Sequence, residues 1–277
     1  YGAESYIIRY DPASKRHDIV LSAKNLCGWL PDHFGDGKIH GDMDFDAAGD
    51  TWALTYFGPV PSKEEWDTVY RGSWLLRYNC FTGEQECLGI PLEGESWPYH
   101  NYDGKRGLFF GVNHTGSSII VYDTKARSMI YGGAPPDGIR WYARCIMMDK
   151  ETGAVYTTDS GDEERHFIRY ERRNNTFTRM KASPPVNPVT GKRGDCRAHT
   201  SLRDADGAFW CLDHQGTVFR FWPDEDRTEY AGVNWSEDGT YNANISMSPG
   251  GRYLYYVPGQ LSEIPRGTPV VQYDTRT

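Results

Sequence analysis

A short phrase recurs down this chain: an apolar run that ends in an aromatic residue, usually followed by a polar one. It occurs at Tyr6–Asp11, Trp74–Asn79, Ile119–Asp123, Phe167–Glu171, Val218–Trp222 and Val270–Asp274. Its aromatic position repeats at intervals of 68, 44, 48, 51 and 52 residues. Such intervals are close to the length of one four-stranded propeller blade. The repeat therefore predicts an all-β fold, a β-propeller of four-stranded blades.

A second phrase, offset from the first, predicts the first two strands of each blade. It pairs His40–Phe45 with Thr51–Leu54, Arg144–Met148 with Ala154–Thr157, His199–Leu202 with Phe209–Leu212, and Asn244–Met247 with Tyr253–Tyr256. Period-two alternation bounded by Gly, Asp and Pro is typical of strands joined by hairpin turns. No stretch keeps a helical period over three capped turns. We expect blades to start near His40, His100, Arg144, His199 and Asn242.

Length and composition favour a single propeller domain over residues 1–277. The chain has 30 Gly and 14% aromatic residues, as expected of a turn-rich β protein. Tyr6–Val20 resemble strands three and four of a blade whose first two strands are missing, and Asp274 ends a third strand. We therefore expect incomplete blades at both ends, and a longer natural protein of seven blades.

The net charge of −8 argues against nucleic-acid binding, which needs a basic surface. No apolar run is long enough to span a bilayer, so we expect no membrane partner. Cys80 and Cys87 flank a predicted hairpin turn and could face each other across it. Sequence spacing alone does not decide whether they form a disulfide.

Polar residues gather where first strands begin and second strands end, and in a propeller these places open on one mouth of the central channel. The first group is His40, Tyr99, His100, Arg140, Tyr142, Arg144, Arg197, His199, Tyr241, Asn242 and Asn244; the second is Tyr56, Asn113, His114, Asp159, Asp213 and His214. Five of the eight histidines fall in these places. Solvated strand ends would explain any one of them, but the concentration favours a functional site.

Several chemistries can be weighed against this residue set. The nucleophile turn of serine hydrolases and the phosphate-binding loops are absent. A glycoside hydrolase would need paired carboxylates, for which Asp42, Asp159 and Asp213 are candidates. His40, His100, His114 and His199 suit a transition metal, and Cys196 adds a thiol. A divalent metal ion is therefore an open alternative.

β-Elimination on a uronic acid matches the residue types best. Removing the proton next to a carboxylate creates an enolate-like dianion, which Arg or Asn donors can stabilise. A neutral His can take that proton, because its pKa lies near working pH. A Tyr can protonate the leaving oxygen, or serve both proton roles when a nearby cation lowers its pKa. All of these residue types occur in the predicted mouth.

The chain resembles the β-propeller polysaccharide lyases, namely ulvan lyases, rhamnose–glucuronate lyases and, more distantly, oligogalacturonate lyase. The resemblance rests on the Lys38–Asp42 segment, the Tyr-Asp-Thr ends of third strands, and the spacing of His100 and His114. It implies a lyase in which His100 and His114 are the paired catalytic His. It further implies that Tyr142 is the acid and that Arg144 or Arg140 neutralises the uronate. The oligogalacturonate branch also uses a His-bound metal.

Within this interpretation we expect Arg144 to be the catalytic cation. The substrate-binding residues would be His40, Arg140, Arg197, His199, Tyr241 and Asn242. The partner would be an acidic polysaccharide or oligosaccharide, and the protein a secreted or periplasmic monomer. The competing hypothesis is a propeller that binds a glycan or protein at the same mouth without chemistry, because propellers host many functions.

Overall fold

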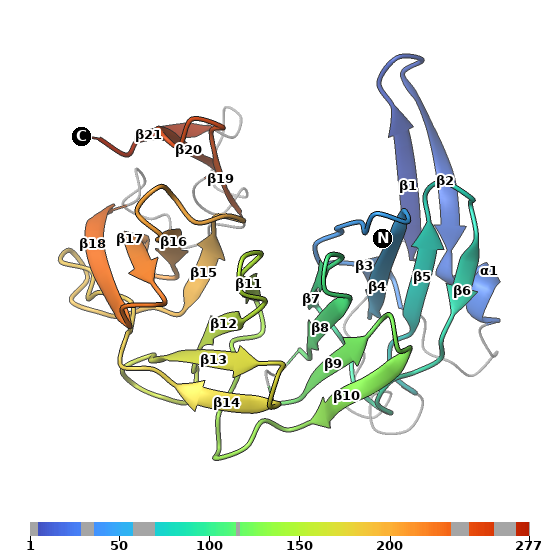
Figure 1. The fold of residues 1–277 in the computed structure, drawn as a ribbon, viewed down its shortest axis with the longest axis horizontal. Coiled ribbons are helices and arrows are strands. Elements are labelled where there is room, and N and C mark those ends of the chain that lie inside the picture. Colours follow the sequence, from blue (N-terminus) through green and yellow to red (C-terminus); the bar gives the residue numbers. More distant parts are fainter. Residues whose placement is uncertain are drawn as a thin grey trace. The chain divides into compact units, whose positions relative to one another are not determined.

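The computed structural model describes residues 5–28, 36–57, 70–114, 117–233, 244–257 and 270–276. The chain divides into two compact units, Tyr1–Pro135 and Pro136–Thr277. Almost all regular structure in the described residues is antiparallel sheet (Figure 1). The helix α1 (Ala23–Cys27) begins where the Ser22 hydroxyl accepts the Asn25 N–H, and it ends at Gly28, whose φ of 62° suits glycine. None of the described helices could cross a lipid bilayer, by length or by hydropathy.

The described residues of the first unit form one two-stranded and two four-stranded sheets. The pair is β1 (Tyr6–Asp11) and β2 (Arg16–Ser22). One four-stranded sheet contains β3 (Lys38–Ile39), β4 (Asp50–Tyr56), β5 (Leu75–Asn79) and β6 (Gln85–Cys87). The other contains β7 (Tyr99–Asp103), β8 (Leu108–Val112), β9 (Ile119–Asp123) and β10 (Ser128–Gly133).

The described residues of the second unit form two four-stranded sheets and one three-stranded sheet. Its first sheet contains β11 (Met147–Met148), β12 (Val155–Thr158), β13 (Phe167–Glu171) and β14 (Thr176–Arg179). Its second contains β15 (Cys196–His199), β16 (Phe209–Asp213), β17 (Thr217–Trp222) and β18 (Arg227–Val233). A described three-stranded sheet follows, with β19 (Ile245–Met247), β20 (Tyr253–Tyr256) and β21 (Val271–Asp274).

In each sheet, neighbouring strands are consecutive in the chain, which is the order predicted for blades. The turns between the first and second strands of the four-stranded sheets are built on an aspartate. Asp46 Oδ1, for example, accepts the N–H groups of Ala48 and Asp50 at 2.9 Å. Asp204 Oδ1 accepts those of Asp206 and Ala208 at 3.0 Å. Short polar side chains that capture nearby backbone donors favour tight turns, so these residues end one strand and start the next.

Apolar residues on facing sheets form the cores within each unit. In the first unit Trp52 and Leu54 pack with Tyr102 and Phe109 of the next sheet. In the second unit the rings of Phe167 and Phe221 stack with centroids 4.0 Å apart and an interplanar angle of 3°. Burying one such aromatic side chain contributes roughly 2 kcal/mol.

The predicted first strands differ from the observed ones in their bounds. The strand expected at His40–Phe45 lies earlier in the chain, at Lys38–Ile39, and the one expected at His199–Leu202 lies at Cys196–His199. Arg144 lies in a turn, because Cys145 N–H bonds to the Tyr142 carbonyl before β11 begins. Site residues therefore come from the loops entering the sheets as well as from strands.

The six cysteines, all within the described residues, are free thiols. The pairing of β5 with β6 places Cys87 opposite Leu76, four positions along the strand from Cys80. A disulfide needs Cα atoms within about 7 Å, and four strand residues span roughly 13 Å. Cys80 and Cys87 therefore do not face each other, and the suggested cross-hairpin bridge is wrong for this register.

Candidate functional site

The predicted site residues are divided between the two units. His40, His100 and His114 lie in the first unit. The second unit contains Arg140, Tyr142, Arg144, Arg197 and His199. Tyr241 and Asn242 lie outside the described residues. Each unit contains a hydrogen-bonded Tyr–His pair, so each has a candidate site of its own.

The pair in the first unit is Tyr56 and His114, with the Tyr hydroxyl 3.1 Å from Nδ1 of the imidazole. Tyr56 ends β4, and His114 follows β8 of the adjacent sheet, so the two come from equivalent places in neighbouring sheets. Lys38 Nζ lies 5.0 Å from the centre of the Tyr56 ring. His40 hydrogen-bonds through Nδ1 to the Pro98 carbonyl at 2.8 Å, which makes Nδ1 the protonated nitrogen.

His100 lies in the same region but is completely buried. Neither of its ring nitrogens has a hydrogen-bond partner among the described residues. Burial lowers its pKa to about 3, with a further contribution from neighbouring His40. Gly41 covers the ring so closely that a Cβ there would lie 2.4 Å from it. A buried neutral imidazole cannot contact a ligand in this arrangement, so a catalytic role for His100 would require the Gly41 segment to move.

The pair in the second unit is Tyr142 and His214, whose hydroxyl oxygen and Nε2 are 2.5 Å apart. The rings meet edge to face with centroids 5.1 Å apart. Tyr142 lies in the loop entering β11, and His214 directly follows β16 of the next sheet. This contact is shorter than the one between Tyr56 and His114, and it joins residues 72 positions apart.

Three guanidinium groups, those of Arg197, Arg144 and Arg165, act electrostatically on His214. Burial, together with the positive charges of Arg197, Arg144 and Arg165, lowers the pKa of His214 to about 4. His214 is therefore neutral at pH 7 and can accept the Tyr142 proton at Nε2. Burial raises the pKa of Tyr142, while Arg197 and Arg144 oppose that rise. The result is a neutral phenol and a neutral imidazole in a positive electrostatic environment.

The three cations differ in how they are held. Arg197 is on β15 and only 4% exposed. Arg144 is half-buried, and no carboxylate of the described residues forms an ion pair with it. Arg165 lies 3.5 Å from Asp195 and donates to the Ser160 and Asp162 carbonyls at 2.9 and 2.6 Å. Arg144 is thus the cation of the site with charge available for a bound anion.

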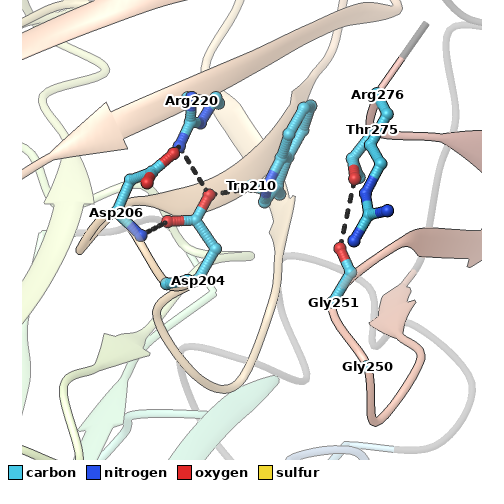
Figure 2. A pocket seen from close by; sticks show the side chains of 9 residues that line it. Asp204, Asp206, Trp210, Arg220, Gly250, Gly251, Thr275 and Arg276 are labelled. Atoms are coloured by element: carbon cyan, nitrogen blue, oxygen red, sulfur yellow. Dashed lines mark hydrogen bonds and ion pairs between the residues drawn. The ribbon is translucent and has the colours of Figure 1, made fainter.

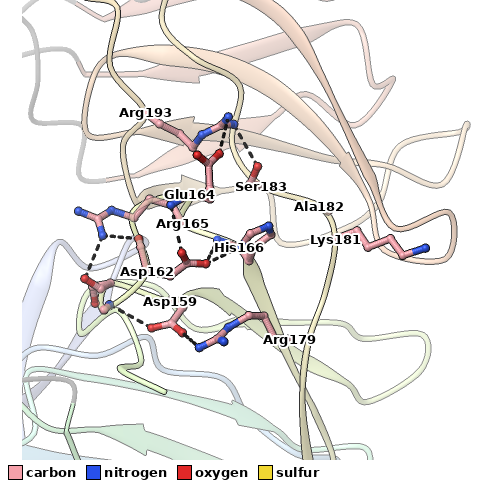
Figure 3. A network of polar contacts seen from close by, with 12 residues as sticks. Asp159, Asp162, Glu164, Arg165, His166, Arg179, Lys181, Ala182, Ser183 and Arg193 are labelled. Carbon is pink, nitrogen blue, oxygen red and sulfur yellow. Dashed lines mark hydrogen bonds and ion pairs between the residues drawn. The ribbon is translucent and has the colours of Figure 1, made fainter. Parts of the chain in front are cut away.

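The loop that carries Arg165 is fixed by a polar network (Figure 3). Asp159 accepts the Arg140 and Gly161 N–H groups and pairs with Arg179 at 2.6 Å. Arg165 itself has a φ of 56°, which is strained for a residue with a side chain. Such strain persists only where surrounding contacts hold it, and here the Ser160 and Asp162 carbonyls and Asp195 hold the Arg165 guanidinium.

Other predicted residues are placed differently. Arg140 is exposed and contributes its backbone N–H to Asp159. His199 is half-buried, with Nδ1 3.0 Å from the Thr200 carbonyl. Asp213 is buried, and its carboxylate accepts the N–H groups of Gln215, Thr217 and Gly194. The carboxylates of Asp159 and Asp213 are therefore occupied in holding loops, which does not favour a paired-carboxylate hydrolase.

The sequence places His214 at the predicted mouth but assigns it no role, and it does not point to Arg165 or Asp195. The signal for His214 was available, because it follows a second strand in the same way as His114. Arg165 and Asp195 had no signal in the sequence. They reach the site through loop paths that spacing does not reveal.

Metal binding finds no support in the described side chains. No three or more His, Cys, Asp or Glu residues among them converge closely enough to hold an ion. His40, His100 and His114 instead contact aromatic rings, and among the described residues His100 lacks even a hydrogen bond.

A pocket of about 230 Å³ lies in the second unit, at the end of β16 opposite to His214 (Figure 2). Its polar groups mainly satisfy one another: Arg220 bonds to Asp204 and Asp206 at 2.8 and 2.6 Å. Trp210 Nε1 donates to Asp204 at 2.9 Å. The pocket is therefore a less reactive candidate than the Tyr142–His214 pair.

No protein-family model matches the chain, and no curated protein sequence does. Solved structures of similar fold include a chain of the nidogen/laminin complex, 14% identical with a TM-score of 0.53, covering 98% of this chain and 86% of that one. A proposed 6-phosphogluconolactonase from Bacteroides fragilis is 15% identical with a TM-score of 0.57, covering 97% and 73%. An oligogalacturonate lyase in complex with manganese is 10% identical with a TM-score of 0.63, covering 97% and 71%.

At these identities the likeness concerns the fold alone. Together with the consecutive four-stranded sheets, it confirms the prediction of an all-β, propeller-type chain built from blades.

Proposed function

We propose that this protein is a polysaccharide lyase that cleaves a uronic-acid-containing glycan by β-elimination at the Tyr142–His214 pair. The observation that carries the proposal is a neutral imidazole 2.5 Å from a phenol, beside half-buried Arg144 and buried Arg197. These are the three functions that the reaction needs: a base, an acid and a cation. An oligogalacturonate lyase is also among the structures of similar fold.

The cations act on the uronate carboxylate. Negative charge grows on this group as the proton next to it leaves, so fixed donors stabilise the transition state more than the bound substrate. Arg144 has no competing ion pair in the described residues and would form the bidentate contact. Arg197, held on β15, would bind the same or a neighbouring uronate.

The proton transfers use both members of the pair. When the Tyr142 hydroxyl turns to the leaving oxygen of the bound substrate, the lone pair of His214 Nε2 becomes available and takes the proton from the carbon next to the carboxylate. As the carbon–carbon double bond forms, the bond to the leaving oxygen breaks and Tyr142 gives its proton to that oxygen. The proton on His214 then passes to the Tyr142 phenolate, which restores both groups. Their hydrogen bond makes this return direct.

In this proposal His214 takes the catalytic role that the sequence resemblance implies for His100 and His114. His114 is exposed and keeps the Tyr56 contact, so it stays a prediction for the first unit. His100 would act in catalysis only after exposure of its ring.

The test is growth of the ultraviolet absorbance of unsaturated uronate when the protein is incubated with uronate-rich polysaccharides. Tyr142→Phe and His214→Gln should each lower kcat by about 10² or more, the scale of a lost positioned acid or base. Tyr170→Phe is a matched control, because that hydroxyl donates to Asn175 at 3.1 Å away from the pair. It should retain wild-type turnover.

Each alternative function or site predicts a different result in this assay. Saturable binding of these glycans with no rise in absorbance would indicate a binding propeller. New reducing ends without unsaturated product would indicate a hydrolase. Wild-type turnover in His214→Gln with loss of turnover in His114→Ala would move the chemistry to the Tyr56–His114 pair.

A further inference from the structure

Two buried side chains connect the backbones of Tyr142 and His214. Thr158 ends β12 and Asp195 precedes β15; they are 0% and 8% exposed. The Thr158 hydroxyl donates to Asp195 Oδ1 at 3.0 Å and accepts the Cys196 N–H at 3.2 Å. One hydrogen bond between side chains thus joins the ends of two neighbouring sheets.

Each end of this bridge holds one member of the Tyr–His pair. The Thr158 carbonyl accepts the Tyr142 N–H at 3.1 Å, and the Asp195 carbonyl accepts the His214 N–H at 3.0 Å. A change in the Thr158–Asp195 separation would therefore be passed to the phenol and the imidazole. A shift of about 1 Å at a reacting pair can cost about 10² in rate.

The strained Arg165 completes the arrangement. Its Nε lies 3.5 Å from Asp195 Oδ2, while two carbonyls of its own loop fix the guanidinium (Figure 3). A buried carboxylate needs such a counter-charge to stay ionised. Asp195 also offsets one of the three positive charges near Tyr142.

We infer that Thr158 and Asp195 are positioning residues for the Tyr142–His214 pair, with Arg165 as the counter-charge of Asp195. The effect on turnover rests on the proposed function, whereas the effect on the Tyr–His hydrogen bond does not. The two can therefore be measured separately.

The experiment compares Thr158→Val with Thr158→Ser and uses Thr157→Val as its control. Thr157 is the adjacent residue of β12, equally buried, and its hydroxyl has no hydrogen-bond partner in the described part of the chain. Both Val variants remove one buried hydroxyl and keep the side-chain shape. Only Thr158→Val removes the bridge.

The first measurement is the ¹⁵N chemical shifts of the His214 ring, which report its tautomer and its hydrogen bond. We expect them to change in Thr158→Val and to match wild type in Thr158→Ser and Thr157→Val. Asp195→Ala removes the acceptor of the Thr158 hydroxyl and should behave like Thr158→Val. Unchanged His214 shifts in both Thr158→Val and Asp195→Ala would overturn the inference.

The second measurement is the lyase assay. In Thr158→Val we expect kcat to fall by about 10- to 100-fold with little change in KM, because alignment rather than binding is lost. Thr158→Ser should retain most of the wild-type kcat. Equal losses in Thr157→Val and Thr158→Val would show a general strand effect and refute the positioning role. A wild type without lyase activity would refute the proposed function and leave the ring shifts to decide this inference.

Discussion

Arg144 is one of the residues that set the working pH of the site. Burial lowers the pKa of His214 most, and the positive charges of Arg197, Arg144 and Arg165 add to it, so the pKa lies at about 4. A base must be unprotonated, so kcat/KM should fall only below about pH 4 in the wild type.

Replacing Arg144 by Gln should raise the pKa of His214 toward its usual value, because one repulsive charge is removed. The acid limb of kcat/KM would then move to higher pH, and activity on the uronate would fall at every pH. The measurement is a pH–rate profile supported by NMR titration of His214. An acid limb that stays in place would contradict a charge effect of Arg144.

Asp36 is a buried carboxylate away from the Tyr142–His214 pair. It accepts hydroxyl donors from Thr55 and Tyr70, yet burial raises its pKa to about 7. The unfolded chain would release this proton near pH 4, so the folded state binds more protons between pH 4 and 7. The contribution of Asp36 to the free energy of unfolding is therefore complete below about pH 4 and is lost as pH rises to 7, by roughly 4 kcal/mol.

Asp36→Asn should remove this dependence, because the amide carries no titrating proton. Urea unfolding at several pH values would give the difference between wild type and variant. We expect the wild type to lose stability relative to Asp36→Asn as pH rises from 4 to 7. A constant difference would mean that Asp36 is ionised in the folded protein at all of these pH values.

At the scale of elements, the aspartate turns also link successive sheets within a unit. Asp46 accepts the hydroxyl of Tyr102 from the next sheet at 3.1 Å. Asp149 occupies the same place in the second unit and pairs with Arg203 of its next sheet at 2.6 Å, with side chains 1% and 5% exposed. The residue that shapes a hairpin thus also joins its sheet to the neighbour.

Arg203→Met should destabilise the fold by about 3–5 kcal/mol, since it leaves Asp149 buried without its cation. Arg9→Met is the matched control: Arg9 and Asp18 form a pair with side chains 60% and 51% exposed, and surface pairs contribute about 0–1 kcal/mol. Chemical denaturation compares the two variants. Equal small losses would show that the Asp149–Arg203 pair does not link the sheets energetically.

At the scale of the whole molecule, charge opposes the proposed substrate. A chain of net charge −8 repels an acidic polysaccharide at long range, although the three guanidiniums attract it at the site. Salt shortens the screening length from about 30 Å at 0.01 M to about 8 Å at 0.15 M, and it weakens distant charges more than partly buried ones.

Over that salt range we expect kcat/KM on a uronate polymer to rise. A methyl-esterified polymer lacks the charge and should show little change. The measurement is initial rates at several salt concentrations. A steady fall with salt would mean that local attraction dominates the encounter.

The sequence by itself determined the strands and their order, because the aromatic repeat and the aspartate turns are local signals. It also located polar residues at strand starts and ends, including Tyr142, Arg144, Arg197 and His214. Only the tertiary structure decided which of them meet. Tyr142 and His214 are 72 residues apart in the chain, and backbone hydrogen bonds from Tyr142 to Thr158 and from His214 to Asp195 hold them together. Gly41 packs directly against the ring of His100, which is buried. Strand starts moved by two or three residues from their predicted places, and a bulge between Cys196 and Ala198 shifts the register beside Arg197. A register shift of one residue, as at a bulge, turns a side chain from one face of a sheet to the other, which sequence spacing cannot reveal.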